Sequence, residues 1–184
     1  MDIAEKLHLF AKQHNSRWNI RYGEVAPFFT DGYACVANGQ NLAACLSFIA
    51  GIEMSLRLPL LHAKGFDIRK AWDPDATGVP LLSNDLLIKA SDIGLPIKFL
   101  RYGRDPEESI FFNNLHSKQL GKRANIVRLR NNICHGNLNI FVEEKDGIAL
   151  VHNSEIEKEA KELEAVFTGW SKGFGEWHTM AEKE

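Results

Sequence analysis

Three polar residues near the end of one predicted helix have the types and spacing that phosphodiester chemistry needs. Arg130, Asn131 and His135 lie in the stretch RLRNNICHGN. A guanidinium stays protonated and can stabilise charge on phosphate oxygens, and an imidazole can move a proton near neutral pH. Asn131 and His135 are four residues apart and therefore share a helix face. These residues are the first candidates for a site.

The helices that must position them carry a second unusual feature, which is a charge within an apolar face. On a helical wheel of about 100° per residue, Glu53 falls near the middle of the apolar arc of the predicted helix from Leu42 to Arg57. Arg130 sits inside the apolar arc of the helix that ends at His135. An unpaired buried charge is costly, so we expect Glu53 and Arg130 to face each other across the bundle core.

Each of these features also has a purely structural interpretation. A His before a Gly is a common helix ending, and a buried Glu–Arg pair often serves structure alone. If the protein has a purely structural role, Glu53→Ala should harm folding, and Arg130 and His135 should contact no shared cleft. The spacing of the residues leaves both interpretations open.

The composition of the 184 residues narrows the class of protein. Hydrophobic residues make up 45% and charged residues 25%, which is typical of one soluble globular domain. The net charge of −2 excludes a generic nucleic-acid coat, so any contact with RNA must be local. Cys35, Cys45 and Cys134 contain no CxxC pair, and no HExxH stretch is present. We therefore expect reduced thiols and no metal or other cofactor.

The two segments that could indicate export or membrane insertion do not have the required pattern. The start, MDIAEKLHLF, carries Asp2 and Glu5 where a signal peptide is basic and then apolar. The most apolar window, from Leu42 to Leu61, contains Glu53 and Arg57 and fits a buried helix better than a membrane span. We expect a cytoplasmic protein with no membrane contact.

Hydrophobic periodicity predicts a mainly α fold, a four- to five-helix bundle with a small β-hairpin insertion before the last helix. The hairpin at 138–152 follows from two β-rich runs around Asp146-Gly147. The expected helices are 2–14, from 38 or 41 to 57, 83–93, a short helix that opens at Pro106, 117–135 and 154–170.

Local residues set the expected ends of these helices. The long apolar helix should stop before Pro59, and Gly136 should close the helix at His135. Ser83 should cap the helix that runs to Ile93, and Ser154 should cap the last helix with Glu157. Residues 15–37 are expected to be irregular or short strands, and 65–80 a loop. The chain is then a single domain, 1–184, with its bundle at about 38–171 and a frayed tail at 172–184.

The motif and its setting together resemble a known family. The run from Arg130 to His135 has the form R-N-x-x-x-H, ends a helix of a bundle and precedes Gly136. This resembles the HEPN superfamily (higher eukaryotes and prokaryotes nucleotide-binding domains). Many members are metal-independent ribonucleases of toxin–antitoxin, phage-defence and RNA-processing systems. An acidic residue on an earlier helix commonly contacts the pair in that family, and Glu53 suits that role. The resemblance covers residues 38–171 but explains neither 1–37 nor the hairpin.

The resemblance implies a metal-independent endoribonuclease that cleaves RNA by attack of its own 2′-hydroxyl, as a toxin or phage-defence effector does. His135 would move the proton, Arg130 would stabilise the phosphorane and Asn131 would orient the imidazole or hold the phosphate. The products would be a 2′,3′-cyclic phosphate and a 5′-hydroxyl. The resemblance also implies a homodimer, with an antitoxin protein as a further partner. The alternative is a non-catalytic nucleotide- or RNA-binding or protein-interaction module on the same bundle.

Two further groups of residues could contact RNA. Lys122, Arg123 and Arg128 form a small basic patch beside the motif, which suits either phosphate contact or an ordinary solvated helix face. The aromatic residues Phe28, Phe29 and Tyr33 could stack on bases, although such residues more often belong to the core.

Overall fold

The chain folds into a mainly helical structure, which confirms the coarser part of the predicted fold class, a mainly α protein. The computed structural model describes residues 25–66, 74–103, 105–116, 122–145 and 148–181, so the helix predicted at 2–14 lies outside the described residues. The elements in chain order are α2 (Ala26–Ala37), α3 (Asn41–Ala63), α4 (Pro74–Thr77), α5 (Asn84–Asp92), η3 (Ile97–Leu100), α6 (Pro106–Asn113), α7 (Asn125–Cys134), η4 (Leu138–Phe141), β1 (Val142–Lys145), β2 (Ile148–Val151) and α8 (Asn153–Ala181).

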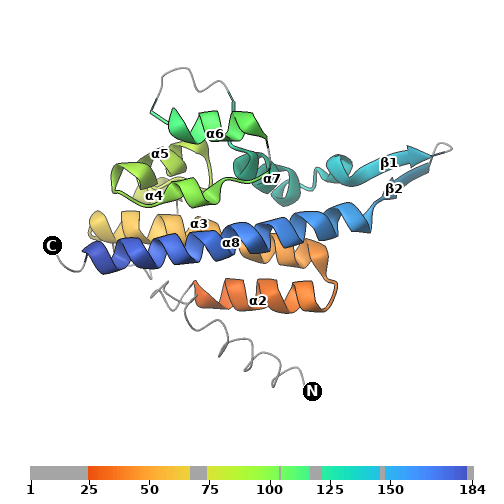
Figure 1. The fold of residues 1–184 in the computed structure, drawn as a ribbon, viewed down its shortest axis with the longest axis horizontal. Coiled ribbons are helices and arrows are strands. Elements are labelled where there is room, and N and C mark those ends of the chain that lie inside the picture. Colours follow the sequence, from red (N-terminus) through yellow and green to blue (C-terminus); the bar gives the residue numbers. More distant parts are fainter. Residues whose placement is uncertain (1–24, 67–73, 104, 117–121, 146–147, 182–184) are drawn as a thin grey trace.

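The two longest helices, α3 and α8, lie side by side through the middle of the molecule (Figure 1). In this view α2 packs along one side of them, and the shorter helices α4 to α7 lie on the other side. Helix α3 contacts α2, α5, α7 and α8. It is therefore the central element against which the helix with the R-N-x-x-x-H motif is placed.

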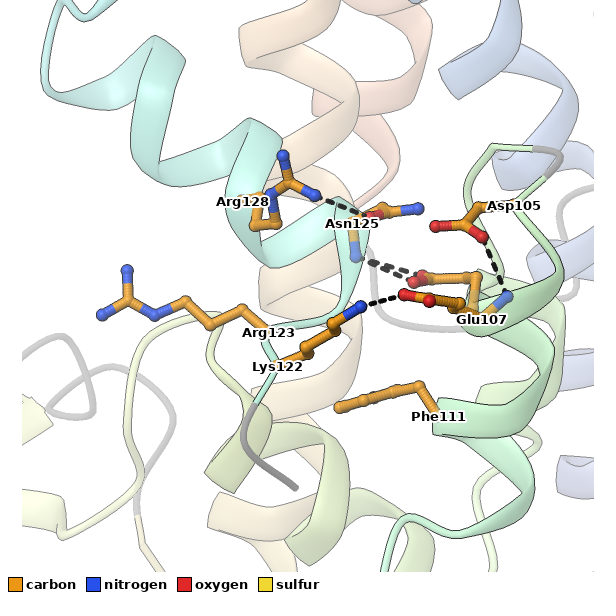
Figure 2. A pocket seen from close by; sticks show the side chains of 8 residues that line it. Asp105, Glu107, Phe111, Lys122, Arg123, Asn125 and Arg128 are labelled. Carbon is orange, nitrogen blue, oxygen red and sulfur yellow. Dashed lines mark hydrogen bonds and ion pairs between the residues drawn. The ribbon is translucent and has the colours of Figure 1, made fainter. Parts of the chain in front are cut away.

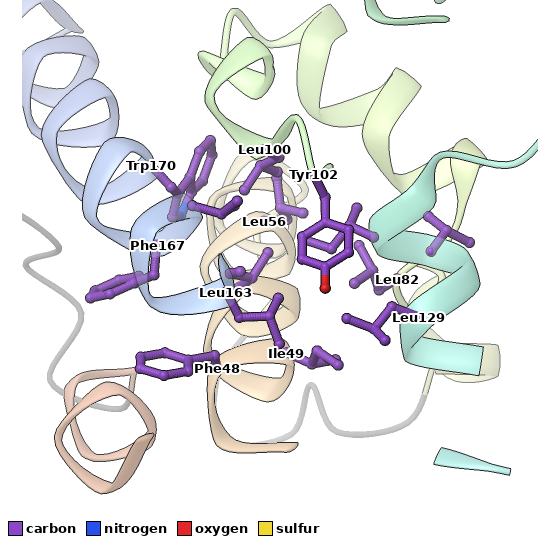
Figure 3. Packing of buried hydrophobic residues seen from close by; sticks show 14 of the residues in the cluster. Phe48, Ile49, Leu56, Leu82, Leu100, Tyr102, Leu129, Leu163, Phe167 and Trp170 are labelled. Carbon is purple, nitrogen blue, oxygen red and sulfur yellow. The ribbon is translucent and has the colours of Figure 1, made fainter. Parts of the chain in front are cut away.

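Aromatic and aliphatic side chains fill the space between these helices (Figure 3). The rings of Phe29 and Phe167 stack with centroids 3.5 Å apart, and Tyr33 meets Phe48 edge-on at 5.2 Å. Trp170 is fully buried and its indole N–H donates to Ser55 Oγ at 2.8 Å. The core thus joins α2, α3 and α8. Phe29 and Tyr33 belong to it, as the more common role of such aromatics predicts.

The prediction of irregular chain or strands at 15–37 is wrong over its second half, where α2 runs from Ala26 to Ala37. Pro27 lies in the first turn, where its missing N–H costs nothing. The turn residues in this segment hid its helical pattern, but Phe29, Gly32 and Tyr33 form one buried face against α3 and α8. The bundle therefore begins before residue 38.

The predicted stop before Pro59 is also wrong, because α3 continues to Ala63 with Pro59 inside it. An interior Pro costs a helix about 3 kcal/mol. The residues around it, from Leu58 to Leu61, are all buried, and burying one large aliphatic side chain contributes about 1.5–3 kcal/mol. Packing therefore outweighs the local penalty.

Of the tail expected to fray at 172–184, residues 172–181 are instead part of α8, which extends to Ala181. Phe174 is fully buried and packs near Trp170, with ring centroids 5.5 Å apart. The helix also begins at Asn153, one residue before the predicted cap at Ser154. Tertiary contacts on one side of α8 keep it helical past the point where its local pattern weakens.

The helix that bears the motif is shorter than predicted, since α7 begins at Asn125 rather than at 117. Residues 117–121 lie outside the described residues, and Lys122, Arg123 and Ala124 precede the helix. Its end is as predicted: Gly136 has φ +68°, and its N–H donates to the carbonyl of Ile133 at 3.1 Å. The N–H of Asn137 donates to Asn132, which completes a Schellman closure.

Two short strands separate η4 from α8. Strands β1 and β2 pair antiparallel, with Val142 opposite Val151 and Lys145 opposite Ile148. The turn residues 146 and 147 lie outside the described residues. In Figure 1 the strands extend away from the bundle beyond the first turn of α8, so they do not contribute to the packing of α7 on α3.

Helix α3 is also the one described helix that is long and apolar enough, by length and composition, to cross a membrane. About 78% of its most apolar window is buried inside the protein. The central helix of a soluble bundle passes the same test, so this helix is weak support for a membrane span.

We predict that Gly51→Ala destabilises the core, because a Cβ at this position would come within 2.5 Å of the buried Phe29 ring. Overpacking of this kind costs roughly 1–3 kcal/mol. Ala is a better helix former than Gly, which offsets about 1 kcal/mol of that cost. Urea unfolding measures the change in the free energy of unfolding. The double variant Gly51→Ala/Phe29→Leu should lose less unfolding free energy than the sum of the two single losses, because the smaller side chain relieves the close contact. Additive effects of the two substitutions would contradict the contact.

Candidate functional site

The site is built around an ion pair between α3 and α7. Arg130 Nε lies 3.4 Å from Glu53 Oε2, and the two side chains are 14% and 15% exposed. This confirms the pairing that the two helical wheels predict. Arg130 also donates from Nη1 to the side-chain oxygen of Asn131 at 3.3 Å. The carboxylate and the amide together hold the guanidinium at the surface of the bundle core.

Glu53 has a further role that the sequence did not indicate. The backbone N–H of Leu82 donates to Glu53 Oε2 at 2.9 Å, so the same carboxylate also fixes the segment that leads into α5. Arg57, one turn further along α3, is only 3% exposed. Burial lowers the pKa of Arg57 and the charge of Glu53 opposes that shift. Glu53 is therefore the counter-charge for two guanidinium groups.

A groove of about 690 Å³ opens beside the ion pair. Arg130 and Asn131 line it from α7, and Arg123 lines it from the segment before that helix. The other side consists of Pro74, Asp75 and residues 80–85. Leu81 and Leu82 form an apolar portion of this side, and Asp75 and Asp85 add two carboxylates. A smaller hollow of about 470 Å³ adjoins it and is lined by Arg123, Arg128, Asn131 and Asn132.

His135 occupies a different position from the other motif residues. It is the exposed C-cap residue of α7, and its backbone N–H donates to the carbonyl of Asn131 at 3.1 Å. The lining of the groove includes Arg130 and Asn131 but not His135. The structure therefore brings Glu53, Arg130 and Asn131 together and leaves the imidazole one turn away, in solvent.

The start of α7 is held by side chains from two other helices. Ala124 cannot cap the helix with its own side chain. The N–H of Ala124 donates instead to Asn84 Oδ1 at 3.1 Å, and Asn84 donates to the carbonyl of Lys122 at 2.9 Å. The N–H of Asn125 donates to both carboxylate oxygens of Glu108, each at 3.1 Å. These contacts fix where the helix begins, and so which way Arg130 points.

The predicted basic patch borders a pocket of about 300 Å³ at this helix start (Figure 2). Lys122, Arg123 and Arg128 line it and are all exposed. Lys122 pairs with Glu107, and Arg128 Nη1 donates to Asn125 Oδ1 at 3.4 Å. Arg123 faces away from these pairs in Figure 2. The patch is therefore a mixed-charge surface rather than a purely positive one.

Glu108 is the group in this pocket whose titration differs most from that of a free side chain. It is 3% exposed, and burial raises its pKa to about 6. The bond from Asn125 opposes that rise and the charge of Asp105 adds to it, whereas Arg101 and Arg128 lower the pKa. The carboxyl therefore changes its charge in mildly acidic solution.

The sequence pattern did not indicate a role for Arg57, Asn84 or Glu108. Arg57 is four residues after Glu53 and shares its helix face, so the wheel that singled out Glu53 could have found it. Glu108 follows Pro106 in the first turn of α6, where an acidic residue is ordinary and therefore not noticed. Asn84 follows the correctly predicted cap Ser83, which accepts from the N–H of Leu86.

Within the described part of the chain, the buried thiol of Cys45 is not a candidate nucleophile and no cluster suited to a metal ion is found. Cys35, Cys45 and Cys134 are free. Burial raises the pKa of Cys45 to about 12, with a smaller contribution from the charge of Glu159, so Cys45 is not a nucleophile at neutral pH. No group of three or more His, Cys, Asp or Glu side chains is suited to a metal ion among the described residues.

Comparison of the chain with protein-family models, with curated proteins and with solved structures found no match. The resemblance to the HEPN superfamily therefore depends on the residues of the motif and on the geometry around them.

We predict that Glu53→Ala lowers the free energy of unfolding by about 2–4 kcal/mol, because it leaves Arg130 and the N–H of Leu82 without their carboxylate. Denaturant unfolding followed by circular dichroism measures this loss. The matched control is Glu155→Ala, which removes an exposed carboxylate paired with Lys158 and should cost less than about 0.5 kcal/mol. Equal effects of the two substitutions would contradict the role of Glu53.

A second prediction concerns pH. The folded pKa of Glu108 lies above the ordinary value of 4.5, so its contribution to stability is full below pH 4.5 and is lost as the pH rises through about 6. Glu108→Gln should remove this loss. Between pH 4.5 and pH 7 the free energy of unfolding of the variant should therefore rise by about 1–2 kcal/mol relative to that of the wild type. Unfolding curves of both proteins across this range measure the difference. Parallel curves would contradict it.

Proposed function

We propose that this chain is a HEPN-type domain that acts as a metal-independent endoribonuclease. The observation that carries the proposal is the contact of Arg130 with Glu53 and Asn131 at the side of an open groove. A guanidinium has five N–H donors. In Arg130, Nη1 donates to Asn131, and Nε faces Glu53 in an ion pair without a hydrogen bond. Donors remain for the oxygens of a phosphodiester in the groove.

The proposed reaction assigns one role to each motif residue. The 2′-hydroxyl of the RNA attacks the adjacent phosphorus, the bond to the 5′-oxygen breaks, and a 2′,3′-cyclic phosphate and a 5′-hydroxyl form. Arg130 stabilises the charge on the non-bridging oxygens, with its direction set by Glu53. Asn131 holds the phosphate, and His135 transfers the proton from the 2′-oxygen or to the leaving 5′-oxygen.

The exposed position of His135 requires a substrate or a second copy to complete the site. An RNA strand held by Arg130 in the groove would pass Asn131 and then His135, because Asn131 and His135 share a face at the end of α7. A homodimer that pairs two copies of α7 would place two imidazoles beside one strand, so that one acts as acid and the other as base. We therefore propose a homodimer as the active form.

The basic residues extend the proposed RNA contact. Arg123 lines both the groove with Arg130 and the pocket at the start of α7, and Arg128 lines the adjoining hollow. Lys122 is engaged with Glu107, so its share of the contact is smaller. We further propose that the domain, a bundle with a hairpin before its last helix, works in the cytoplasm as a toxin or phage-defence effector with an antitoxin protein as partner.

A second function is favoured by one observation, which is that His135 does not line the groove. A non-catalytic RNA- or nucleotide-binding module needs Arg130, Asn131 and the basic residues but no imidazole. This alternative predicts that RNA binds and stays intact, and that His135→Ala changes nothing.

We predict that the protein cleaves total or transfer RNA in EDTA, and that His135→Ala or Arg130→Ala reduces the rate by about 10²–10⁴-fold. End analysis should find 2′,3′-cyclic phosphates and 5′-hydroxyls, and a 2′-deoxy substitution at the cut site should block cleavage. Cys134→Ala is the matched control, since Cys134 is exposed on the same turn of α7. Cleavage by both wild type and His135→Ala, or by neither, would eliminate the catalytic proposal.

A further inference from the structure

The pocket at the start of α7 contains balanced charges. Three carboxylates, from Asp105, Glu107 and Glu108, line it together with three cations, from Lys122, Arg123 and Arg128 (Figure 2). With all six groups ionised the pocket has no net charge. The gain of one proton would make it positive, and the charge of such a surface governs how strongly it attracts a phosphodiester backbone.

Glu108 is the member of this set that is placed to take up that proton. It is 3% exposed and lies against the first residue of α7, whose N–H donates to both of its carboxylate oxygens. The other two carboxylates of the pocket, Asp105 and Glu107, are exposed. Water therefore solvates their charges, whereas the charge of Glu108 depends on the protein around it.

Charged groups on three neighbouring segments act on Glu108. Asp105 caps α6 on the same side, Arg101 follows η3, and Arg128 projects from α7. The charge of Asp105 raises the pKa of Glu108 in addition to burial, and the two arginines and the N–H of Asn125 oppose this only in part, so its pKa is about 6. Its protonation then falls in a pH range that cells and their compartments reach.

This pocket shares two arginines with the hollows of the proposed site. Arg123 lines the pocket and also the groove that contains Arg130 and Asn131. Arg128 lines the pocket and the hollow that contains Asn131 and Asn132. A strand held by Arg130 would therefore pass these two arginines, and its next phosphates would meet the charge balance that Glu108 sets.

We propose that Glu108 controls, through its protonation, how tightly an RNA backbone binds along Arg123 and Arg128. Ionised Glu108 balances the cations of the pocket and weakens binding, and protonated Glu108 leaves a net positive charge and strengthens it. The inference rests on the RNA contact of the proposed function but not on cleavage. Glu108 acts here through the pocket and the start of α7, so it is a positioning residue and not a catalytic one.

The test measures binding without cleavage. All proteins carry His135→Ala, which removes the one motif imidazole, and the probe is a fluorescent 2′-O-methyl RNA oligonucleotide. Anisotropy gives Kd at pH 5 and pH 7.5 at constant low ionic strength. With Glu108 present we expect binding about three- to tenfold tighter at pH 5, the effect of one added charge on a polyanion. With Glu108→Gln, binding at pH 7.5 should already be that tight and should change little at pH 5.

The matched control is Glu107→Gln, which removes one charge from the same pocket at an exposed position. It should tighten binding at both pH values and keep the ratio between them. The same ratio in all three proteins would overturn the proposal, as would the absence of RNA binding at either pH. The two proposals can fail separately. If the protein does not cleave RNA but the pH ratio is lost only in Glu108→Gln, the nuclease proposal is wrong and the binding proposal is supported.

A second measurement does not depend on the folding of a variant. Calorimetry of the same oligonucleotide at pH 6, in two buffers of different ionisation enthalpy, reports the protons taken up on binding. We expect net uptake of a fraction of one proton with Glu108 present, because the phosphates favour its neutral form. Binding with no proton uptake at this pH would overturn the proposal.

Discussion

The ion pair between Glu53 and Arg130 constrains the rest of this structure. A guanidinium cannot lose its proton at any biological pH. A helix with Arg130 on its apolar side therefore packs where a carboxylate can pair with the guanidinium. Glu53 supplies that carboxylate from the middle of α3 and also accepts the N–H of Leu82. One side chain thereby fixes α7 and the segment before α5 on the central helix. The groove beside Arg130 exists because these two segments are held at the same point.

The position of α7 along its own axis is determined separately at its two ends. Asn84 and Glu108 accept the first N–H groups at the start, and the Schellman closure at Gly136 terminates the helix directly after His135. A helix fixed at both ends and in the middle has little freedom to rotate or slide. Arg130 and Asn131 therefore face the groove, while His135 stays in solvent at the last turn. The geometry supports phosphate binding more directly than it supports proton transfer, and for this reason the proposed mechanism uses a second copy.

Local sequence rules failed wherever tertiary burial outweighed them. Pro59 was expected to end a helix, but the buried leucines around it keep α3 helical. Residues 26–37 and 170–181 have weak helical patterns, and both are helical because aromatic residues such as Phe29 and Phe174 are enclosed by other helices. Rules that depend on a few neighbouring residues were more successful. The caps at Ser83 and Gly136 and the helix start at Pro106 are all where the sequence placed them.

The sequence by itself determined that the chain is mainly helical and that Glu53 and Arg130 must meet, because periodicity and the cost of an isolated buried charge are visible without coordinates. It also determined the order of Arg130, Asn131 and His135 along one helix. Only the tertiary structure decided that Arg130 and Asn131 line a groove which His135 does not. It alone brought Glu108 to the start of α7 from a separate helix, because contacts between distant segments depend on how whole faces pack and not on spacing within one of them.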